Sequence, residues 1–142
     1  MDPYPSTEAP TSDPQRPHVL IVDDNQPLLE FLVLLLEDQG FALTAVTSPL
    51  QAAVLASQTR FDLVLSDVRM PKLSGPELLT EIRNTPVNRD VPAILISGQA
   101  SIELGDWLPA SSNTYYLRKP FGGNELLELV RHVLRWHEAK PG

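Results

Sequence analysis

The chain has 142 residues, 42% of them hydrophobic, which fits one domain with a single buried core. Its net charge of −7 argues against a nucleic-acid-binding surface, and the lack of cysteine excludes disulfides and thiolate metal sites. No apolar run reaches the roughly 20 residues that cross a bilayer, and no secretion signal opens the chain, so we expect a soluble, cytoplasmic protein without direct contact to nucleic acid or membrane.

Residues 1–17 differ in composition from the rest. They hold five of the 14 prolines together with Ser, Thr, Asp and Glu, and they show no apolar periodicity. Such a stretch buries too little apolar surface to fold on its own. We expect a disordered leader or linker here.

From His18 onward, short apolar runs alternate with amphipathic segments, as is typical of β-α repeats around a parallel sheet. Strands are predicted at 18–22, 42–47, 63–66, 93–96 and 115–117. Helices are predicted at about 27–40, 49–57, 75–84 and 123–138. A further helix between the last two strands is the weakest prediction, because Gly105 lies inside it and Pro109 must end it, and we expect mobility there. The pattern predicts an α/β fold with a doubly wound, five-stranded parallel sheet.

Local signals mark where two of these helices begin. Ser48 followed by Pro49 is typical of an N-cap with proline at the first helical position. Ser74 with Glu77 three residues later predicts a capping box.

Polar side chains with related chemistry end several of the predicted strands. Asp23 and Asp24 follow the first strand and Asp67 follows the third, while Ser97 and Lys119 close two later ones. Each has an ordinary explanation alone, such as a turn or a solvated side chain, but ligands collect at this edge of such sheets. Carboxylates about 5 Å apart repel by roughly 3 kcal/mol per pair at an effective dielectric near 20, so a cation must balance them. An all-oxygen cluster of this kind favours Mg²⁺.

Four motifs in order make a resemblance apparent. They are Val22 to Asn25, Ser66 to Pro71, Ile96 to Gly98 and Tyr116 to Phe121. With these motifs the chain resembles the receiver domain of two-component response regulators, including single-domain regulators of the chemotaxis type. The resemblance covers His18 to about Trp136. It implies a flavodoxin-like (βα)5 sheet of strand order 2-1-3-4-5, with the domain at 18–138 and a short tail at 139–142.

The resemblance also implies a role for each residue of the cluster. Asp67 would be the nucleophile that accepts a phosphoryl group. Mg²⁺ would be held by the side chains of Asp24 and Asp67 and the backbone carbonyl of Arg69, with Asp23 acting mainly through water. Ser97 and Lys119 would contact phosphoryl oxygens. In the switch that follows, the Ser97 hydroxyl moves toward the phosphate and Tyr116 swings inward behind it.

The chemistry of the residues agrees with this interpretation. An aspartate nucleophile must stay ionised, and both a divalent cation and a lysine favour its charged form. Phosphoryl transfer asks mainly for position and charge neutralisation, so no general base is needed. We therefore predict Mg²⁺-dependent transfer from a phosphohistidine of a sensor histidine kinase or a histidine phosphotransfer protein. The domain would not be an enzyme in the usual sense, although it would promote its own phosphorylation and dephosphorylation.

Several alternatives stay open. The chain would serve as a stand-alone regulator, or as the receiver module of a hybrid histidine kinase or larger regulator in a phosphorelay. A receiver-like scaffold without phosphorylation is disfavoured because no signature residue is missing. An aspartyl-phosphate hydrolase acting on small molecules usually has a second acid two residues after its nucleophile, where this chain has Arg69. A flavodoxin-like protein that binds a nucleotide phosphate after the first strand is disfavoured, because Asp23 and Asp24 would repel that phosphate. His18, His132 and His137 are not expected to be ligands, because their spacing brings none of them together.

Two predicted helices have more apolar residues than one buried face needs. In the first, Leu28, Phe31, Leu32, Leu35 and Leu36 are predicted to face the sheet, which leaves Leu29, Val33 and Leu34 for a kinase docking surface. In the last, Leu126, Val130, Val133 and Leu134 are predicted to face inward, which leaves Leu127, Leu129 and Trp136. That surplus suggests a homodimer or a downstream output protein as partner. No sequence remains after the last helix for an output domain, so we expect output through such a partner.

Overall fold

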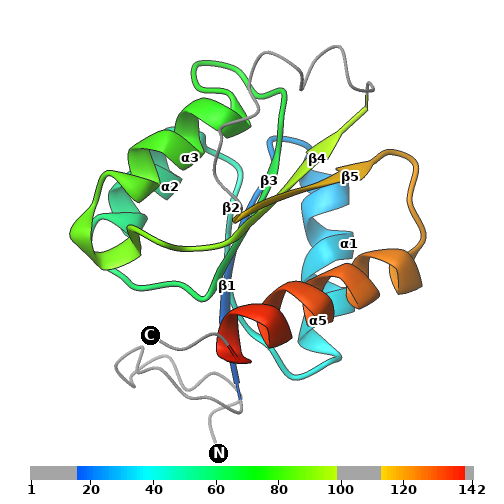
Figure 1. Ribbon diagram of the computed structural model, residues 1–142. Coiled ribbons are helices and arrows are strands. Elements are labelled where there is room, and N and C mark those ends of the chain that lie inside the picture. The colour runs from blue at the N-terminus through cyan, green and yellow to red at the C-terminus, as the bar shows by residue number, and fades with distance from the viewer. Residues whose placement is uncertain (1–15, 99–112, 140–142) are drawn as a thin grey trace, which may run out of the picture.

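The computed structural model of the protein describes residues 16–98 and 113–139 (Figure 1). The predicted leader up to residue 15, the predicted helix between the last two strands and most of the predicted tail lie outside the described residues. No helix in these two described ranges is long and apolar enough to cross a membrane.

Five parallel strands form one sheet in the order β2-β1-β3-β4-β5, which confirms the predicted fold class and strand order. The strands are β1 His18–Val22, β2 Ala42–Val46, β3 Leu63–Asp67, β4 Ala93–Ser97 and β5 Thr114–Arg118. The helices are α1 Gln26–Glu37, α2 Pro49–Ala56, α3 Gly75–Arg83 and α5 Gly123–Ala139, with a 3₁₀ turn η1 at Pro86–Asn88. All of these helices and strands were predicted to within three residues at each end, except the short turn η1.

Helices cover both faces of the sheet, with α1 and α5 on one side and α2 and α3 on the other (Figure 1). Every residue of β3 and β4 is buried, as expected for central strands of a parallel sheet. Alternate strand residues face opposite sides. Leu63 and Leu65 join the core under α1 and α5, whereas Val64 joins the core under α2 and α3. Burial on both faces holds the parallel strands in place, and their carboxyl ends share one edge of the sheet.

The predicted helix starts are confirmed in detail. The Ser48 hydroxyl accepts a hydrogen bond from the backbone N–H of Gln51 at 3.2 Å. Ser74 and Glu77 form the full capping box, in which each side chain accepts a hydrogen bond from the other's backbone N–H, at 3.0 and 3.2 Å. A further cap, Asn25, accepts from the backbone N–H of Leu28 and begins α1 directly after the paired aspartates.

The predicted inward face of α1 was partly wrong. Leu29 was predicted to point away from the sheet but is 5% exposed, and Val33 packs against the core. Phe31 was predicted to face inward but is 45% exposed, and Leu34 is 67% exposed. Apolar residues fill every position from 28 to 36 except Glu30, so the sequence does not define which face is buried. The outward apolar surface of α1 therefore consists of Phe31 and Leu34.

In α5 the inward stripe is confirmed for Leu126, Val130 and Val133, which are fully buried. Leu127 was predicted to be surplus but is buried as well and belongs to the same core. Leu129 and Leu134 are partly buried against the same core. The Trp136 side chain lies outside the described ones.

Candidate functional site

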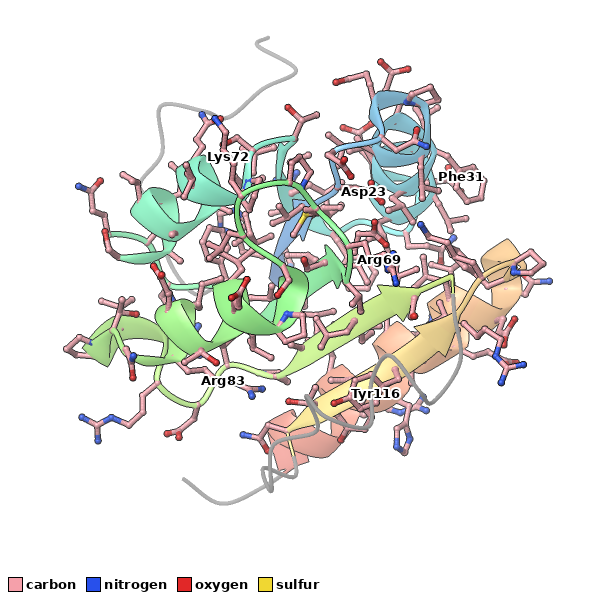
Figure 2. The ribbon with its side chains drawn as sticks, turned by 90° about the horizontal axis from the view of Figure 1, so that it is seen from above. Asp23, Phe31, Arg69, Lys72, Arg83 and Tyr116 are labelled. Carbon is pink, nitrogen blue, oxygen red and sulfur yellow. The ribbon has the colours of Figure 1, made fainter. Side chains whose placement is uncertain are left out.

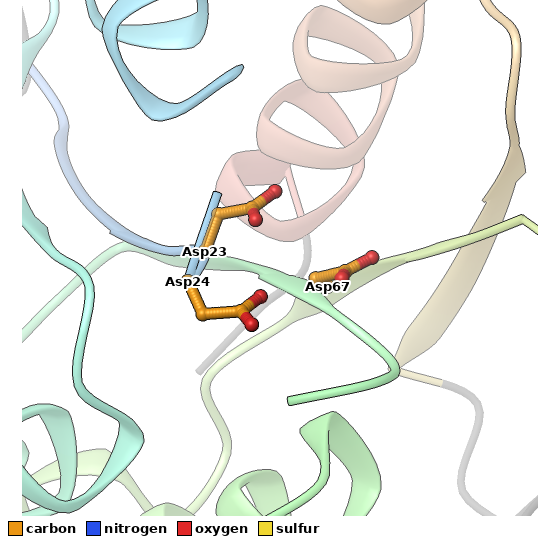
Figure 3. Close-up of side chains that lie close together, drawn as sticks. All are labelled: Asp23, Asp24 and Asp67. Carbon is orange, nitrogen blue, oxygen red and sulfur yellow. The ribbon is translucent and has the colours of Figure 1, made fainter. Parts of the chain in front are cut away.

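Three carboxylates meet at the carboxyl ends of β1 and β3 (Figure 3). Asp23 and Asp24 follow β1 directly, and Asp67 is the last residue of β3. One oxygen from each lies within 4.8 Å of the others, with Asp23 and Asp67 buried and Asp24 exposed. The pairing of Val22 with Ser66 in the β1–β3 ladder sets this proximity. The predicted acidic cluster is therefore present.

Asp23 is the most buried member, with 1% of its surface exposed. Its Oδ1 accepts a hydrogen bond from the backbone N–H of Asn25 at 2.9 Å. Its Oδ2 is buried and has no hydrogen-bond partner among the residues that the structure describes. Such an orphaned acceptor is costly unless a cation or a water molecule takes the place of the missing partner.

Burial raises the pKa of Asp23 to about 6, and the negative charges of Asp67 and Asp24 act in the same direction. The Asn25 hydrogen bond and the charge of Lys119 oppose this rise. Burial also raises the pKa of Asp67, against the hydrogen bond and the charge of Lys119. Burial therefore makes ionisation of Asp23 and Asp67 less favourable than in water, and Lys119 offsets only part of this cost.

Lys119 brings a cation to the cluster. Its Nζ lies 3.1 Å from Asp67 Oδ1 in an ion pair. The backbone N–H of Lys119 donates to the Ser97 carbonyl at 2.8 Å, so the ends of β4 and β5 are tied together. Ser97 is the buried last residue of β4. The structure thus places Ser97 and Lys119 at the edge that carries the aspartates, as predicted.

Arg69 and Tyr116 complete the predicted set of residues. Arg69 lies in the exposed loop after Asp67, on the side of the molecule viewed in Figure 2. Tyr116 is half-buried on β5, in register with Leu95 of β4. Its neighbour Tyr115 faces the other side of the sheet, where it packs edge-on against His132. Strand alternation therefore puts Tyr115 and Tyr116 on opposite faces of the sheet.

Residues 19–131 match the family described as the response regulator receiver domain. The chain belongs to this family. This confirms the resemblance that the four motifs indicated. The receiver domain is that of a two-component response regulator.

Two of the relatives are about twice as long as the segment that matches this chain. The chain is 34% identical over 127 residues to the uncharacterized transcriptional regulatory protein YkoG of Bacillus subtilis, covering 89% of this chain and 54% of that protein. It is 37% identical over 122 residues to CseB of Streptomyces avermitilis, covering 85% of this chain and 50% of that protein. The chain thus spans about half the length of these relatives.

Solved structures of receiver domains and chemotaxis proteins have the same fold as this chain. The receiver domain of sensor histidine kinase PA1611 from Pseudomonas aeruginosa, which holds a magnesium ion in its active-site cleft, has a TM-score of 0.76 and 30% identity. The match covers 84% of this chain and 98% of that one. The chemotaxis protein CheY4 of Vibrio cholerae has a TM-score of 0.78 and 28% identity, over 84% and 99% of the two chains.

Gly75 is a site residue of this receiver domain that the sequence indicated only as a helix start. Its backbone N–H donates to the Val68 carbonyl at 2.8 Å. A Cβ on Gly75 would lie 2.3 Å from the Asp67 carbonyl oxygen, which also accepts a hydrogen bond from the Ser66 hydroxyl. The first turn of α3 therefore packs directly on the backbone of Asp67. Glycine is a poor helix former, and its place in a first turn was the available signal.

The loop between β3 and α3 holds one strained residue. Lys72 has a φ of 76°, in the left-handed region that costs a non-glycine residue about 1 kcal/mol. Met70, earlier in the loop, is buried in the core under α2 and α3. The loop therefore leaves Asp67, turns over this core and returns to it at Gly75.

The histidines whose side chains are described lie away from this site. His18 begins β1, where its Nε2 lies 2.7 Å from the Thr44 hydroxyl and its ring packs edge-on against Phe61. Burial lowers the pKa of His18 more than the charge of Asp62 raises it. His132, on α5, contacts Tyr115 of β5, and the His137 side chain is not described.

Proposed function

We propose that this receiver domain accepts a phosphoryl group on Asp67, in a Mg²⁺-dependent transfer from a phosphohistidine of a sensor histidine kinase or a histidine phosphotransfer protein. One observation carries the proposal: three carboxylates gather within 4.8 Å of one another, and one of them pairs with Lys119 at 3.1 Å. Receiver modules occur alone, in larger regulators and in hybrid kinases, and the proposal holds for each of these.

The residues present fit a magnesium ion. Asp23 Oδ2 is a buried acceptor without a partner among the described residues, and each side chain of the cluster offers a carboxylate oxygen as metal ligand, which suits this hard cation. Asp24 and Asp67 would hold the ion through their carboxylates and Arg69 through its carbonyl, with Asp23 acting through water. When bound, the ion neutralises negative charge on the carboxylates and on the incoming phosphoryl oxygens.

The reaction itself uses few side chains of this chain. A carboxylate oxygen of Asp67 attacks phosphorus, so an O–P bond forms while the P–N bond to the donor imidazole breaks and its electron pair returns to that nitrogen. Asp67 must be ionised for this step, and the charge of Lys119 favours that form. Lys119 then turns from Asp67 toward a phosphoryl oxygen, where it stabilises the charge gathered in the transition state. No side chain has to remove a proton.

The phosphorylated domain would switch through Ser97 and Tyr116. The added group brings about two negative charges and three strong acceptors to the edge where Ser97 ends β4. The Ser97 hydroxyl turns toward it, and Tyr116 on the neighbouring strand takes the space behind. The changed surface of β5 and α5 is where an output protein or a second copy would bind.

The kinase docking surface that we propose is the exposed apolar part of α1. Phe31 and Leu34 are the exposed large hydrophobic residues of this helix. α1 begins two residues after Asp24, so a helical partner lying along it comes close to the acidic site. A cytoplasmic location agrees with the supply of phosphohistidine donors. Changing both residues to Glu should slow transfer from the cognate kinase and leave transfer from acetyl phosphate unchanged.

Incubation with acetyl phosphate, with and without Mg²⁺, tests the proposed function. We expect the intact mass to rise by one phosphoryl group only when the metal is present, and Asp67→Asn to abolish the rise. Asp62→Asn is the matched control, because Asp62 lies five residues earlier and bonds to Arg60 and His18 instead. No mass gain in the unmodified chain, or an equal gain in Asp67→Asn, would contradict the proposal. Continuous phosphate release from a small phosphoester would favour the hydrolase alternative.

A further inference from the structure

Arg83, the last residue of α3, joins three elements at the amino-terminal side of the sheet. Its Nε and Nη2 both donate to the Val91 carbonyl, at 3.0 and 2.8 Å, and Val91 lies two residues before β4. Nη2 also donates to the Asn113 carbonyl at 2.9 Å, and Nη1 donates to the Thr114 hydroxyl at 2.9 Å. One guanidinium therefore ties the end of α3 to the beginnings of β4 and β5.

All four of these hydrogen bonds go to neutral acceptors. Burial lowers the pKa of the Arg83 guanidinium, while Tyr116 and Asp90 raise it. A guanidinium stays protonated in proteins, so a positive charge sits in a half-buried position without a carboxylate among its described hydrogen-bond partners. This charge acts on the groups that share its side of the sheet.

Tyr116 is such a group. Thr114 and Tyr116 are two residues apart on β5 and therefore lie on the same face, which is the face of Arg83 (Figure 2). The Tyr116 hydroxyl is buried and has no hydrogen-bond partner in the part of the chain that the structure describes. Burial raises the pKa of its phenol, and the charge of Arg83 lowers it. The cation is thus close enough to act on this hydroxyl.

Arg83 has one N–H donor that its described hydrogen bonds do not use. A guanidinium has five N–H donors, and its described hydrogen bonds use the one on Nε, both on Nη2 and one of the two on Nη1. One Nη1 donor is left without an acceptor among the described residues. Among the described residues, the Arg83 side chain with its unused donor and the unpartnered Tyr116 hydroxyl therefore lie on the same face of β5.

The two strands that Arg83 ties together also lead to the phosphoacceptor site. The β4–β5 ladder pairs Ala93 with Thr114, Leu95 with Tyr116 and Ser97 with Arg118. At its far end, the Lys119 N–H bonds the Ser97 carbonyl. Arg83 and the site residues are thus at opposite ends of one strand pair, with Tyr116 between them.

We propose that Arg83 is a positioning residue of the phosphorylation switch, which holds the amino ends of β4 and β5 on α3 and offers the inward Tyr116 hydroxyl a cationic donor. The inference rests on the proposed function of Asp67. The Tyr116 hydroxyl is buried without a hydrogen-bond partner among the described residues, and such a position is costly until a donor is supplied. The donor of Arg83 favours the inward position. Tyr116 thereby responds to the end of α3 as well as to the phosphoryl group.

Fluorine NMR of 3-fluorotyrosine at position 116 tests this inference. The chain has three tyrosines, so a Tyr4→Phe, Tyr115→Phe background leaves one signal. The shift between H2O and D2O reports how much of the ring population is buried, in the free protein and with Mg²⁺ and beryllofluoride as phosphate analogue. We expect Arg83→Met to lower the ratio of buried to exposed ring about fivefold, the factor that a hydrogen bond of ordinary strength corresponds to. Arg83→Lys, which keeps the charge, should lower it less.

Arg89→Met is the matched control, because Arg89 is an exposed arginine six residues later and its loss changes the net charge equally. An unchanged buried fraction in folded Arg83→Met would overturn the inference. Should Arg83→Met fail to fold, Arg83→Gln takes its place, and a buried fraction equal to that of the unmodified chain has the same meaning. The measurement on the free protein needs no phosphoryl transfer, so a failure of the proposed function shows separately as a missing mass gain.

Discussion

Asn88 and Asp23 are both buried polar side chains, with 2% and 1% of their surfaces exposed, yet their hydrogen bonding differs sharply. Asn88 Oδ1 accepts from the Phe61 N–H at 2.9 Å, and its Nδ2 donates to the carbonyls of Ala56 and Thr59 at 2.7 and 2.9 Å. Asp23 has one oxygen bonded and the other without a described partner. The first arrangement stabilises the fold, whereas the second leaves a buried acceptor without a described partner, as the proposed magnesium site would require.

The difference follows from what each side chain joins. Asn88 lies on η1 and bonds three backbone groups, from the end of α2 and from the segment before β3. Asp23 lies at the edge where the parallel strands end, beside Asp24 and Asp67. Removal of the Asn88 side chain should therefore lower stability and leave phosphorylation unchanged. Removal of the Asp23 charge should instead raise stability and weaken magnesium binding.

The largest effect is expected for Asn88→Ala. It removes three hydrogen bonds and leaves the Phe61 N–H and two carbonyls without partners, which should lower the free energy of unfolding by roughly 3 kcal/mol. Urea denaturation measures this loss. Acetyl phosphate should still modify Asp67 in the folded fraction at the unmodified rate. An unchanged denaturation midpoint would show that water satisfies these groups and would break the comparison.

Gly75→Ala should have a slightly smaller effect on stability and a clear one on function. The new Cβ would lie 2.3 Å from the Asp67 carbonyl oxygen, so α3 or the end of β3 must shift. Overpacking of this kind costs about 1–3 kcal/mol. Because the contact is with the backbone of the nucleophile, phosphorylation should also slow. Gly122→Ala is the control, since a Cβ there meets nothing within 4 Å.

These two predictions also show which features the sequence discloses. Strand ends and caps such as Ser48 and Ser74 depend on neighbours within three residues, so their local pattern was sufficient. Asn88 bonds partners 27 to 32 residues away in the chain, and Arg83 bonds partners 8, 30 and 31 residues away; no local pattern reveals such contacts. The buried face of α1 was predicted partly wrongly for another reason. Its apolar residues surround the helix, and the position of the sheet decides which side is buried.

The acidic site was predictable in composition and not in its hydrogen bonding. Strand-end positions indicated that Asp23, Asp24 and Asp67 gather at one edge, because parallel strands share that edge. The unpartnered Oδ2 of Asp23 and the contact of Gly75 with Asp67 depend on how the following loops close, which spacing alone leaves undetermined.

Asp23→Asn should reverse the usual sign of a buried substitution. It removes a charge that burial and two neighbouring carboxylates disfavour, and its new N–H₂ group finds acceptors in those carboxylates. We expect the metal-free protein to gain roughly 1 kcal/mol in free energy of unfolding. Magnesium affinity should fall at least about tenfold, as titration calorimetry can measure, because an oxygen that orients the metal's water is lost. A destabilised variant with full magnesium affinity would contradict this view of Asp23.

The same carboxylate predicts a pH dependence that separates the metal-free and metal-bound proteins. The pKa of Asp23 rises from 3.8, the ordinary value for an unfolded chain, to about 6 in the folded protein, so folding strengthens proton binding. The stability contributed by this proton is fully present below 3.8 and is lost as pH rises through about 6. Asp67, whose pKa is also raised, contributes with the same sign.

Metal-free protein should therefore become more stable as pH falls from about 7 toward 5, by about 1 kcal/mol, whereas magnesium binding should weaken over the same range because it competes with the proton. Thermal denaturation at several pH values, with EDTA and with Mg²⁺, gives both curves. Asp23→Asn should flatten the EDTA curve and leave only the smaller contribution of Asp67. Parallel curves with and without the metal would mean that Asp23 takes no part in binding it, and the contrast with Asn88 would then reduce to a difference in hydrogen-bond number.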